Sequence, residues 1–154
     1  MRFYSAGNFY LSSIQQGIQG AHVLGELFTK YGENTTGGGY SLFDWGRNHK
    51  TMICLNGGNA SSLREFYALL HSSDNKYLPY AKFHEDEQSL DNAMTCVGVV
   101  VPARIYEAEW VKPGTKGNDE GYWWYTWPDG VSGEQIVGWE ATLATALKGM
   151  PLAR

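Results

Sequence analysis

Residues 95–101, TCVGVVV, are the most strongly β-prone run of the chain, because threonine and valine branch at Cβ and favour an extended backbone. Residues 2–4 (RFY), 50–55 (KTMICL) and 79–83 (PYAKF) predict three further strands. One helical pattern lies between the strands at 2–4 and 50–55, and another lies between those at 50–55 and 79–83. Since strand, helix and strand form a crossover unit, the order predicts an α/β fold with a small mixed β-sheet and packed helices.

The first predicted helix begins at Ser12 or Ser13 and ends at Tyr31-Gly32. Apolar residues recur in it at three- and four-residue steps, so we expect this stripe to face the core. The second helix begins at a capping box, Ser62–Glu65. The stripe of the first helix consists of Ile14, Ile18, Ala21, Gly25 and Phe28, and the second is expected to bury Leu63, Phe66, Tyr67 and Leu70.

The C-terminal third differs in composition. Residues 122–127, YWWYTW, precede a Pro-Asp-Gly turn and predict an aromatic β-hairpin that returns at 135–138, with a further strand at 105–111 before it. A final helix is predicted at 139–147. Because both faces of the hairpin arm are aromatic, we expect another subunit to cover it.

We expect a single domain over residues 1–154, with an α/β core at 1–111 and the hairpin and helix at 112–154 as an oligomer contact. The segment 32–49, which contains three consecutive glycines, is predicted to be a loop.

Composition restricts the partners. The chain has 12 Lys and Arg against 16 Asp and Glu, and the net charge of −4 disfavours a long nucleic acid as partner. The longest apolar runs are too short to span a membrane, and no signal peptide precedes them, so an intracellular protein without a membrane partner is expected. Cys54 and Cys96 lie in apolar runs and are interpreted as buried thiols.

Several polar clusters permit two interpretations. His22 stands beside Gln15, Gln16 and Gln19 on the first helix, either as a solvated strip or as a set of donors for a base or ribose edge. The run His84–Glu87 fits a solvated loop better than a metal site, because adjacent side chains alternate in direction. No nucleophile elbow is present, and we expect no catalytic residue, no metal ligand and no cofactor.

Two other segments permit a similar choice. Residues 56–59 fit a plain turn or, at a helix start, an anion site. Arg104, which follows the strand at 95–101, is either a surface residue or a phosphate ligand.

Residues 1–106, through YLSSIQQGIQGAHVLGELF, KTMICLN and FHEDEQSLDNAMTCVGVVVP, resemble the archaeal and eukaryotic type of peptidyl-tRNA hydrolase. In that family a helix that bears glutamine and histidine packs on a small mixed sheet. When His22 is aligned with the family's helix histidine, Gln15 occupies the position of its catalytic lysine. This resemblance implies a hydrolase as the alternative function.

A second resemblance covers most of the chain. The segments MRFYSAGNFYLSSIQQGIQGAHVLGELFTKYG, HKTMICLNGG and YAKFHEDEQSLDNAMTCVGVVVPARIY are similar to the first named family of phage proteins that defeat Thoeris immunity. Members of this family bind, without cleaving, the glycocyclic ADP-ribose signal made by TIR-domain proteins in the host bacterial cytoplasm. Some are hexamers that also hold cyclic di- or trinucleotides.

The second resemblance implies a binding protein, not an enzyme, that forms a dimer or hexamer. It assigns the pocket to Phe83 for the adenine face, Arg104 for the pyrophosphate, and Asn92 with Asp91 for ribose hydroxyls. His22 and Gln19 complete the expected ligand-binding set. A structural phage protein that assembles through the aromatic hairpin is a third class of function.

Overall fold

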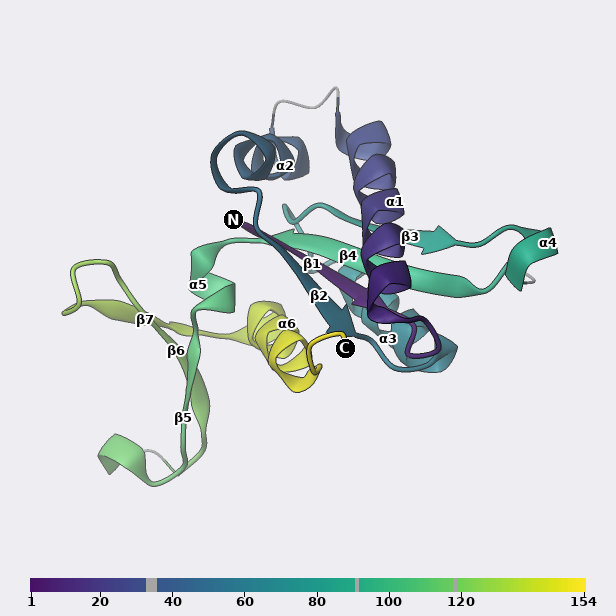
Figure 1. Ribbon diagram of the computed structural model, residues 1–154. Coiled ribbons are helices and arrows are strands. Elements are labelled where there is room, and N and C mark those ends of the chain that lie inside the picture. Colours follow the sequence, from purple (N-terminus) through teal and green to yellow (C-terminus); the bar gives the residue numbers. More distant parts are fainter. Residues whose placement is uncertain (33–35, 91, 118) are drawn as a thin grey trace. The chain divides into compact units, whose positions relative to one another are not determined.

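A computed structural model describes residues 1–32, 36–90, 92–117 and 119–154. The chain forms two compact units, Met1–Val101 with Met150–Arg154, and Pro102–Gly149 (Figure 1). The boundary falls between Val101 and Pro102, earlier than the position after residue 111 that was expected from the sequence. The second unit is therefore an insertion between the last strand of the first unit and its C-terminal segment.

The first unit contains a mixed four-stranded sheet in the order β2-β1-β4-β3. Strand β1 pairs in parallel with β2, whereas β4 runs antiparallel to both β1 and β3. The strands span Arg2–Gly7 (β1), Met52–Asn56 (β2), Tyr80–His84 (β3) and Met94–Val101 (β4). All eight residues of β4 are buried, as its unbroken β-prone run suggested, and the α/β prediction is confirmed.

The two long helices of the first unit cover opposite faces of this sheet (Figure 1). Helix α1 (Ser13–Tyr31) follows β1, and α3 (Ala60–Leu70) follows β2. A Cβ atom placed on Gly20 of α1 would touch Ser5, whereas Leu63 of α3 lies beside the next residue of β1, Ala6. Successive strand residues point to opposite faces, so the two helices take opposite sides.

The caps of both helices are visible in the structure. The Ser12 hydroxyl accepts from the backbone N–H of Gln15, whose side chain accepts from the Ser12 N–H in return, so this end is a capping box. In α3 the expected capping box is wrong, because Asn59 is the N-cap and accepts from the Ser62 N–H at 2.9 Å. Leu63, Phe66 and Leu70 are buried as predicted, and Tyr67 is half-buried.

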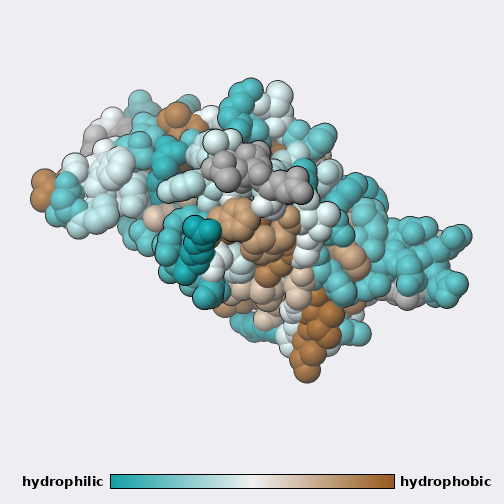
Figure 2. Space-filling view, turned by 90° about the horizontal axis from the view of Figure 1, so that it is seen from above, coloured by the Kyte–Doolittle hydropathy of each residue, from teal (hydrophilic) through white to brown (hydrophobic). Residues whose placement is uncertain are grey.

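Helix α1 buries the face opposite to the one predicted from the sequence. The buried residues are Gln16, Gln19, Gly20, Val23 and Leu27. The predicted core stripe faces outward, and Ile14 and Ile18 are 75% and 51% exposed. Figure 2 shows hydrophobic residues exposed on the side of the molecule that α1 covers. Gln16 and Gln19 face the sheet instead, and their side-chain NH2 groups donate to the Leu11 carbonyl and to Glu85.

The predicted loop at 32–49 is wrong over most of its described part. Residues Gly38–Asp44 form helix α2, and Trp45–His49 form a π-helical turn, η1. Leu42 and Trp45 join the core with Phe3 and Val23. The Trp45 indole N–H also donates to the Thr51 carbonyl at 2.8 Å. Because Leu42 and Trp45 are buried, this segment is helical in spite of its glycine-rich composition.

Between β3 and β4, residues Glu87–Leu90 form the helical turn α4.

The second unit contains a three-stranded antiparallel sheet in the order β5-β6-β7. The predicted hairpin is confirmed, although its return strand begins two residues earlier than expected. The predicted strand at 105–111 is confirmed only at Glu109–Val111, because Ile105 and Tyr106 belong to a short helix. The elements span Ala103–Tyr106 (α5), Glu109–Val111 (β5), Thr115–Gly117 (η2, a 3-10 turn), Tyr122–Thr126 (β6), Gly133–Ile136 (β7) and Gly138–Gly149 (α6).

One face of β6 is covered by its own unit. Tyr125 is buried with Ala108 and Ile136, and the Trp123 indole N–H donates to the Thr145 hydroxyl of α6 at 2.9 Å. This face therefore needs no second subunit, contrary to the expectation for both faces. Trp124, which points the other way, is exposed. Within the part of the chain that the structure describes, no helix is both long and apolar enough to cross a membrane.

Candidate functional site

A β-bulge in the first unit positions the central residue of the candidate site. Phe83 pairs with Cys96, but the next residue, His84, pairs with Met94, so Thr95 has no partner in the register. A bulge of this kind bends a strand and turns a side chain out of its normal alternation. The Thr95 hydroxyl is directed at α1, where it donates to Gln19 Oε1 at 2.8 Å.

Gln19 connects this hydroxyl to a carboxylate. Its side-chain amide donates to Glu85 Oε1, while its carbonyl oxygen accepts from Thr95. Gln19 and Thr95 are buried, and Glu85 is half-buried. A buried amide with both ends bonded has a fixed orientation, so this chain of three residues holds α1 and the end of β3 in a defined polar arrangement.

His22, one turn further along α1, stacks on Phe83. The two rings lie 4.5 Å apart with an interplanar angle of 11°. His22 is exposed and Phe83 half-buried. A pair of nearly parallel rings beside a buried amide offers an aromatic surface and a hydrogen-bonding edge to a planar ligand.

A cavity of about 420 Å³ opens beside Thr95. Asn8, Gln15 and Thr95 contribute polar groups to its lining, and Leu11, Ala60 and Tyr10 contribute apolar surface. It lies where β1 and β2 end and α1 and α3 begin. Because the two helices leave parallel neighbouring strands on opposite faces, this edge has the geometry at which open α/β sheets bind ligands.

The cavity rim is held by backbone hydrogen bonds between the two strand-to-helix turns. The Gly57 N–H donates to the Gly7 carbonyl at 2.8 Å, and the Phe9 N–H donates to the Gly58 carbonyl at 2.8 Å. Gly58 has φ +81°, which favours glycine at this turn. The turn at 56–59 is thus an ordered part of the rim, and its Asn59 side chain caps the start of α3 by accepting from the Ser62 N–H.

Two buried polar atoms lie in the same layer between α1 and the sheet. Ser5 Oγ and Gln16 Oε1 have no hydrogen-bond partner among the described residues. The Gln16 amide donates to the Leu11 carbonyl at 3.0 Å, so only its oxygen is left over. Unsatisfied buried acceptors cost free energy, and their concentration in one layer distinguishes it from an apolar helix–sheet interface.

The sequence-predicted residues divide between several places. Gln19, His22 and Phe83 come together as described. Asn92 has φ +57°, and its backbone carbonyl accepts from His84 Nδ1 at 2.8 Å. Its side chain is exposed. Asp91 lies outside the described residues, so its predicted role stays a prediction.

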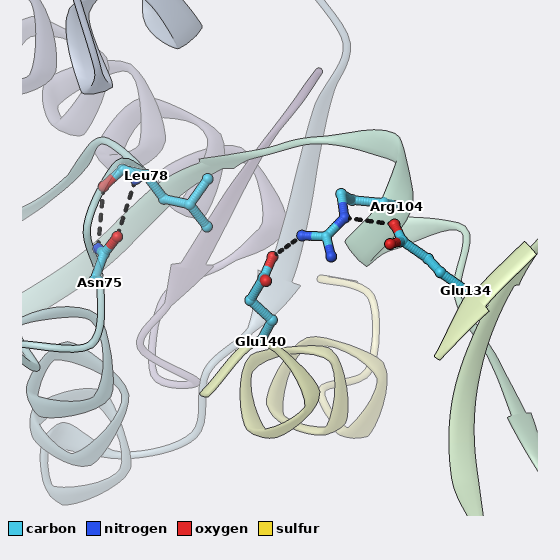
Figure 3. Close-up of polar contacts among 5 residues, drawn as sticks. All are labelled: Asn75, Leu78, Arg104, Glu134 and Glu140. Carbon is cyan, nitrogen blue, oxygen red and sulfur yellow. Dashed lines mark hydrogen bonds and ion pairs between the residues drawn. The ribbon is translucent and has the colours of Figure 1, made fainter. Parts of the chain in front are cut away.

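Arg104 belongs to the second unit, where two carboxylates engage it. Its Nε donates to Glu134 at 2.9 Å and its Nη1 to Glu140 (Figure 3). Burial alone lowers the pKa of this guanidinium, but the hydrogen bonds to Glu140 and Glu134 outweigh burial and raise the pKa above its ordinary value. Within its unit Arg104 joins β7 to α6, and a pyrophosphate on it would have to compete with both carboxylates.

Sequence reasoning missed Thr95, Glu85 and Asn8. Thr95 looked like an ordinary strand residue, and Glu85 stood in an acidic run interpreted as solvated. No described group of three or more His, Cys, Asp or Glu side chains is arranged to hold a metal ion. Both cysteines are free, and burial raises the pKa of the Cys96 thiol to about 12. Cys54 is only half-buried, so its prediction as a buried thiol was too strong.

Comparison of the chain with protein-family models and with curated proteins gives no match.

Proposed function

We propose that this protein binds and sequesters, without cleaving it, the glycocyclic ADP-ribose signal of TIR-domain proteins, as a phage protein that inhibits Thoeris immunity. The observation that carries the proposal is the His22–Phe83 ring pair beside the buried Gln19–Thr95 bond and the cavity at the ends of β1 and β2. The resemblance described above supplies the identity of the ligand, and the site supplies groups that suit it.

Each part of such a ligand has a suitable group in the first unit. Adenine stacks on an aromatic surface, which the His22–Phe83 pair offers. Ribose hydroxyls both donate and accept, and carboxamide and carboxylate groups such as Gln15 and Glu85 match them. The pyrophosphate suits the first turn of α3, where Ala60 lines the cavity, although the Ser62 N–H of that turn already donates to Asn59. A cavity of about 420 Å³ lies within the size range of small-ligand sites.

Sequestration requires tight binding. A protein removes a signal only if its dissociation constant lies below the concentration that activates the host effector, and nanomolar affinity corresponds to about −12 kcal/mol. The hydrogen-bonded rim and the fixed Gln19 amide reduce the ordering cost of binding. A homo-oligomer, dimer or hexamer, and cyclic di- or trinucleotides as further ligands belong to the same proposal.

A peptidyl-tRNA hydrolase-like enzyme is the second candidate. One observation favours it: α1 packs Gln16 and Gln19 on a small mixed sheet and carries His22, in line with the first resemblance. The two candidates differ in what happens to the bound molecule. A sequestering protein returns it unchanged, and a hydrolase releases product.

The test is to incubate the purified protein with glycocyclic ADP-ribose, remove unbound ligand by filtration, heat the retained protein and identify the released compound by chromatography. Stoichiometric recovery of intact ligand is the expected result. Accumulation of ADP-ribose would overturn sequestration, and failure to deplete the ligand would remove this nucleotide as the target.

Substitutions connect the result to the site. Phe83→Ala removes the ring that stacks on His22 and is expected to weaken capture at least tenfold, about 1.4 kcal/mol. Asn92→Gly is also expected to weaken capture, because it removes the side-chain amide while it permits the positive φ. Phe43→Ala is the matched control, because Phe43 is also a half-buried phenylalanine but lies in α2. Equal losses in Phe83→Ala and Phe43→Ala would argue against the proposed site.

A further inference from the structure

The second unit carries a separate cavity that the nucleotide proposal does not use. Its volume is about 450 Å³, and it is lined by Glu107, Glu109, Trp124, Thr126 and Lys148. These residues come from the end of α5, from β5 and β6, and from α6. All of these lining residues belong to the Pro102–Gly149 unit.

Trp124 is the aromatic wall of this cavity, and its position is set by a glycine. The indole lies against Gly133 of β7, where an added Cβ atom would come 2.6 Å from Nε1. Because residue 133 has no Cβ atom, the Trp124 ring packs directly on the backbone of β7. Even so, Trp124 keeps 36% of its residue surface exposed and lines the cavity, so part of the indole is available to a ligand.

The polar groups around the indole include both hydrogen-bond acceptors and hydrogen-bond donors. Glu109 stands directly opposite Trp124 in the β5–β6 register, and Glu107 adds a second carboxylate that only accepts hydrogen bonds. Lys148 donates one hydrogen bond to the Tyr106 carbonyl at 2.7 Å, and an ammonium group has two further donors. The Thr126 hydroxyl both donates and accepts.

This combination selects among ligand classes. A phosphate offers only acceptors and would be repelled by two carboxylates, and Lys148 offsets part of the attraction that these carboxylates exert on a cation, so a cation is kept as a competing outcome of the test below. A neutral sugar has hydroxyls that donate to the carboxylates and accept from the ammonium group, and its C–H face carries weakly positive hydrogens that suit the negative face of an indole. We propose that the Trp124 cavity of the second unit binds a neutral pyranoside.

The proposal is tested by NMR on the whole protein, following the tryptophan indole N–H signals during titration with the methyl glycosides of glucose, galactose, mannose and N-acetylglucosamine. The Trp124 signal is identified by its absence in Trp124→Ala. At least one glycoside is expected to shift it, with a dissociation constant on the order of 1 mM, as befits a ligand of few heavy atoms. Trp124→Ala should lose this binding, and Glu109→Gln should weaken it severalfold.

Trp110→Ala is the matched control. Trp110 follows Glu109 in β5 and pairs with Trp123, so it points to the opposite face of the sheet, yet it is 50% exposed. Its removal should change the affinity less than twofold. The proposal is overturned if no glycoside shifts the Trp124 signal up to about 20 mM. It is also overturned if only phosphate, tetramethylammonium or glycocyclic ADP-ribose shifts that signal. Failure with every glycoside leaves the nucleotide proposal for the first unit untouched, whereas a shift by glycocyclic ADP-ribose alone would count against both proposals.

Discussion

Thr95 shows how one hydroxyl organises the first unit's site. It is buried, it lies at the bulge of β4, and it donates to Gln19 at 2.8 Å, with the Phe83 carbonyl as a longer contact at 3.5 Å. Gln19 in turn donates to Glu85. The position of the α1 amide thus depends on a residue 76 positions away in the sequence.

Replacing Thr95 tests this dependence. Thr95→Val keeps the shape but leaves Gln19 Oε1 buried without its donor, which is expected to lower the free energy of unfolding by about 1–3 kcal/mol. Thr95→Ser keeps the hydroxyl and should lose only about 1 kcal/mol through the missing methyl group. Urea unfolding measures both. If Thr95→Val were as stable as the natural protein, the bond would contribute nothing to the site.

At this scale the sequence pointed to part of the site. Gln19, His22 and Phe83 carry side chains whose chemistry is visible in isolation, and the structure brings them together. Thr95 escaped notice because a bulge is a property of strand register, which depends on pairing between distant segments. The assignment of Arg104 to a phosphate had no means of including its partners Glu134 and Glu140, which lie 30 and 36 residues away.

Helix α1 illustrates the element scale. Its periodicity, cap and end were predictable, but the buried face was not. Hydrophobic patterning places apolar residues inward, whereas here the inward face holds two glutamines whose amides bond to Leu11 and Glu85. Gln19, with both ends of its amide bonded, is buried at little cost, and a pattern within one helix does not reveal such partners.

Two glycines in the same unit should respond oppositely to alanine. Gly25 lies on the exposed face of α1 with no atom within 4 Å of an added Cβ, so Gly25→Ala should stabilise the protein by about 0.5–1 kcal/mol. At Gly98 of β4, an added Cβ would come 2.6 Å from the buried ring of Phe3 and 2.7 Å from Val23. Gly98→Ala should therefore destabilise it by about 1–3 kcal/mol.

Thermal and urea unfolding of both variants measure the difference. Gly17→Ala serves as a second control, because Gly17 is half-buried but an added Cβ there also has no atom within 4 Å. A destabilised Gly25→Ala protein would indicate that this face is covered in solution, for instance in an oligomer.

At the scale of the whole molecule, residues 150–154 return to the first unit after the insertion. The Asn56 N–H donates to the Pro151 carbonyl at 2.8 Å, and the Ala153 N–H donates to the Cys54 carbonyl at 3.0 Å. Leu152 forms a β-bridge with Leu55. This segment therefore protects part of the edge of β2, which is an outer strand of the sheet.

Ala153→Pro removes one of these donors and is expected to release the segment. Hydrogen exchange at the Asn56 amide should then accelerate, because its acceptor Pro151 moves away. Exchange in β6, which belongs to the other unit, should stay unchanged. Ala153→Gly retains the N–H and is the control. Equal protection of Asn56 in both variants would show that the segment does not depend on that bond.

The division into two units was only partly predictable. The change in composition marked the aromatic C-terminal third, but a boundary is set by which segments pack together, and the return of residues 150–154 to β2 leaves no local signal in the sequence.

Because residues 150–154 pack on β2, the first unit is completed only when the last residues of the chain have been synthesised. A ribosome makes the chain from its N-terminus, so β1 to β4 emerge first and residues 102–149 follow. Until residues 150–154 have also emerged, the edge of β2 that they protect stays open to other chains. The nascent protein therefore passes through a stage in which the first unit has its helices and sheet but an unguarded edge, and slow translation of the insertion would prolong the risk of aggregation at that edge.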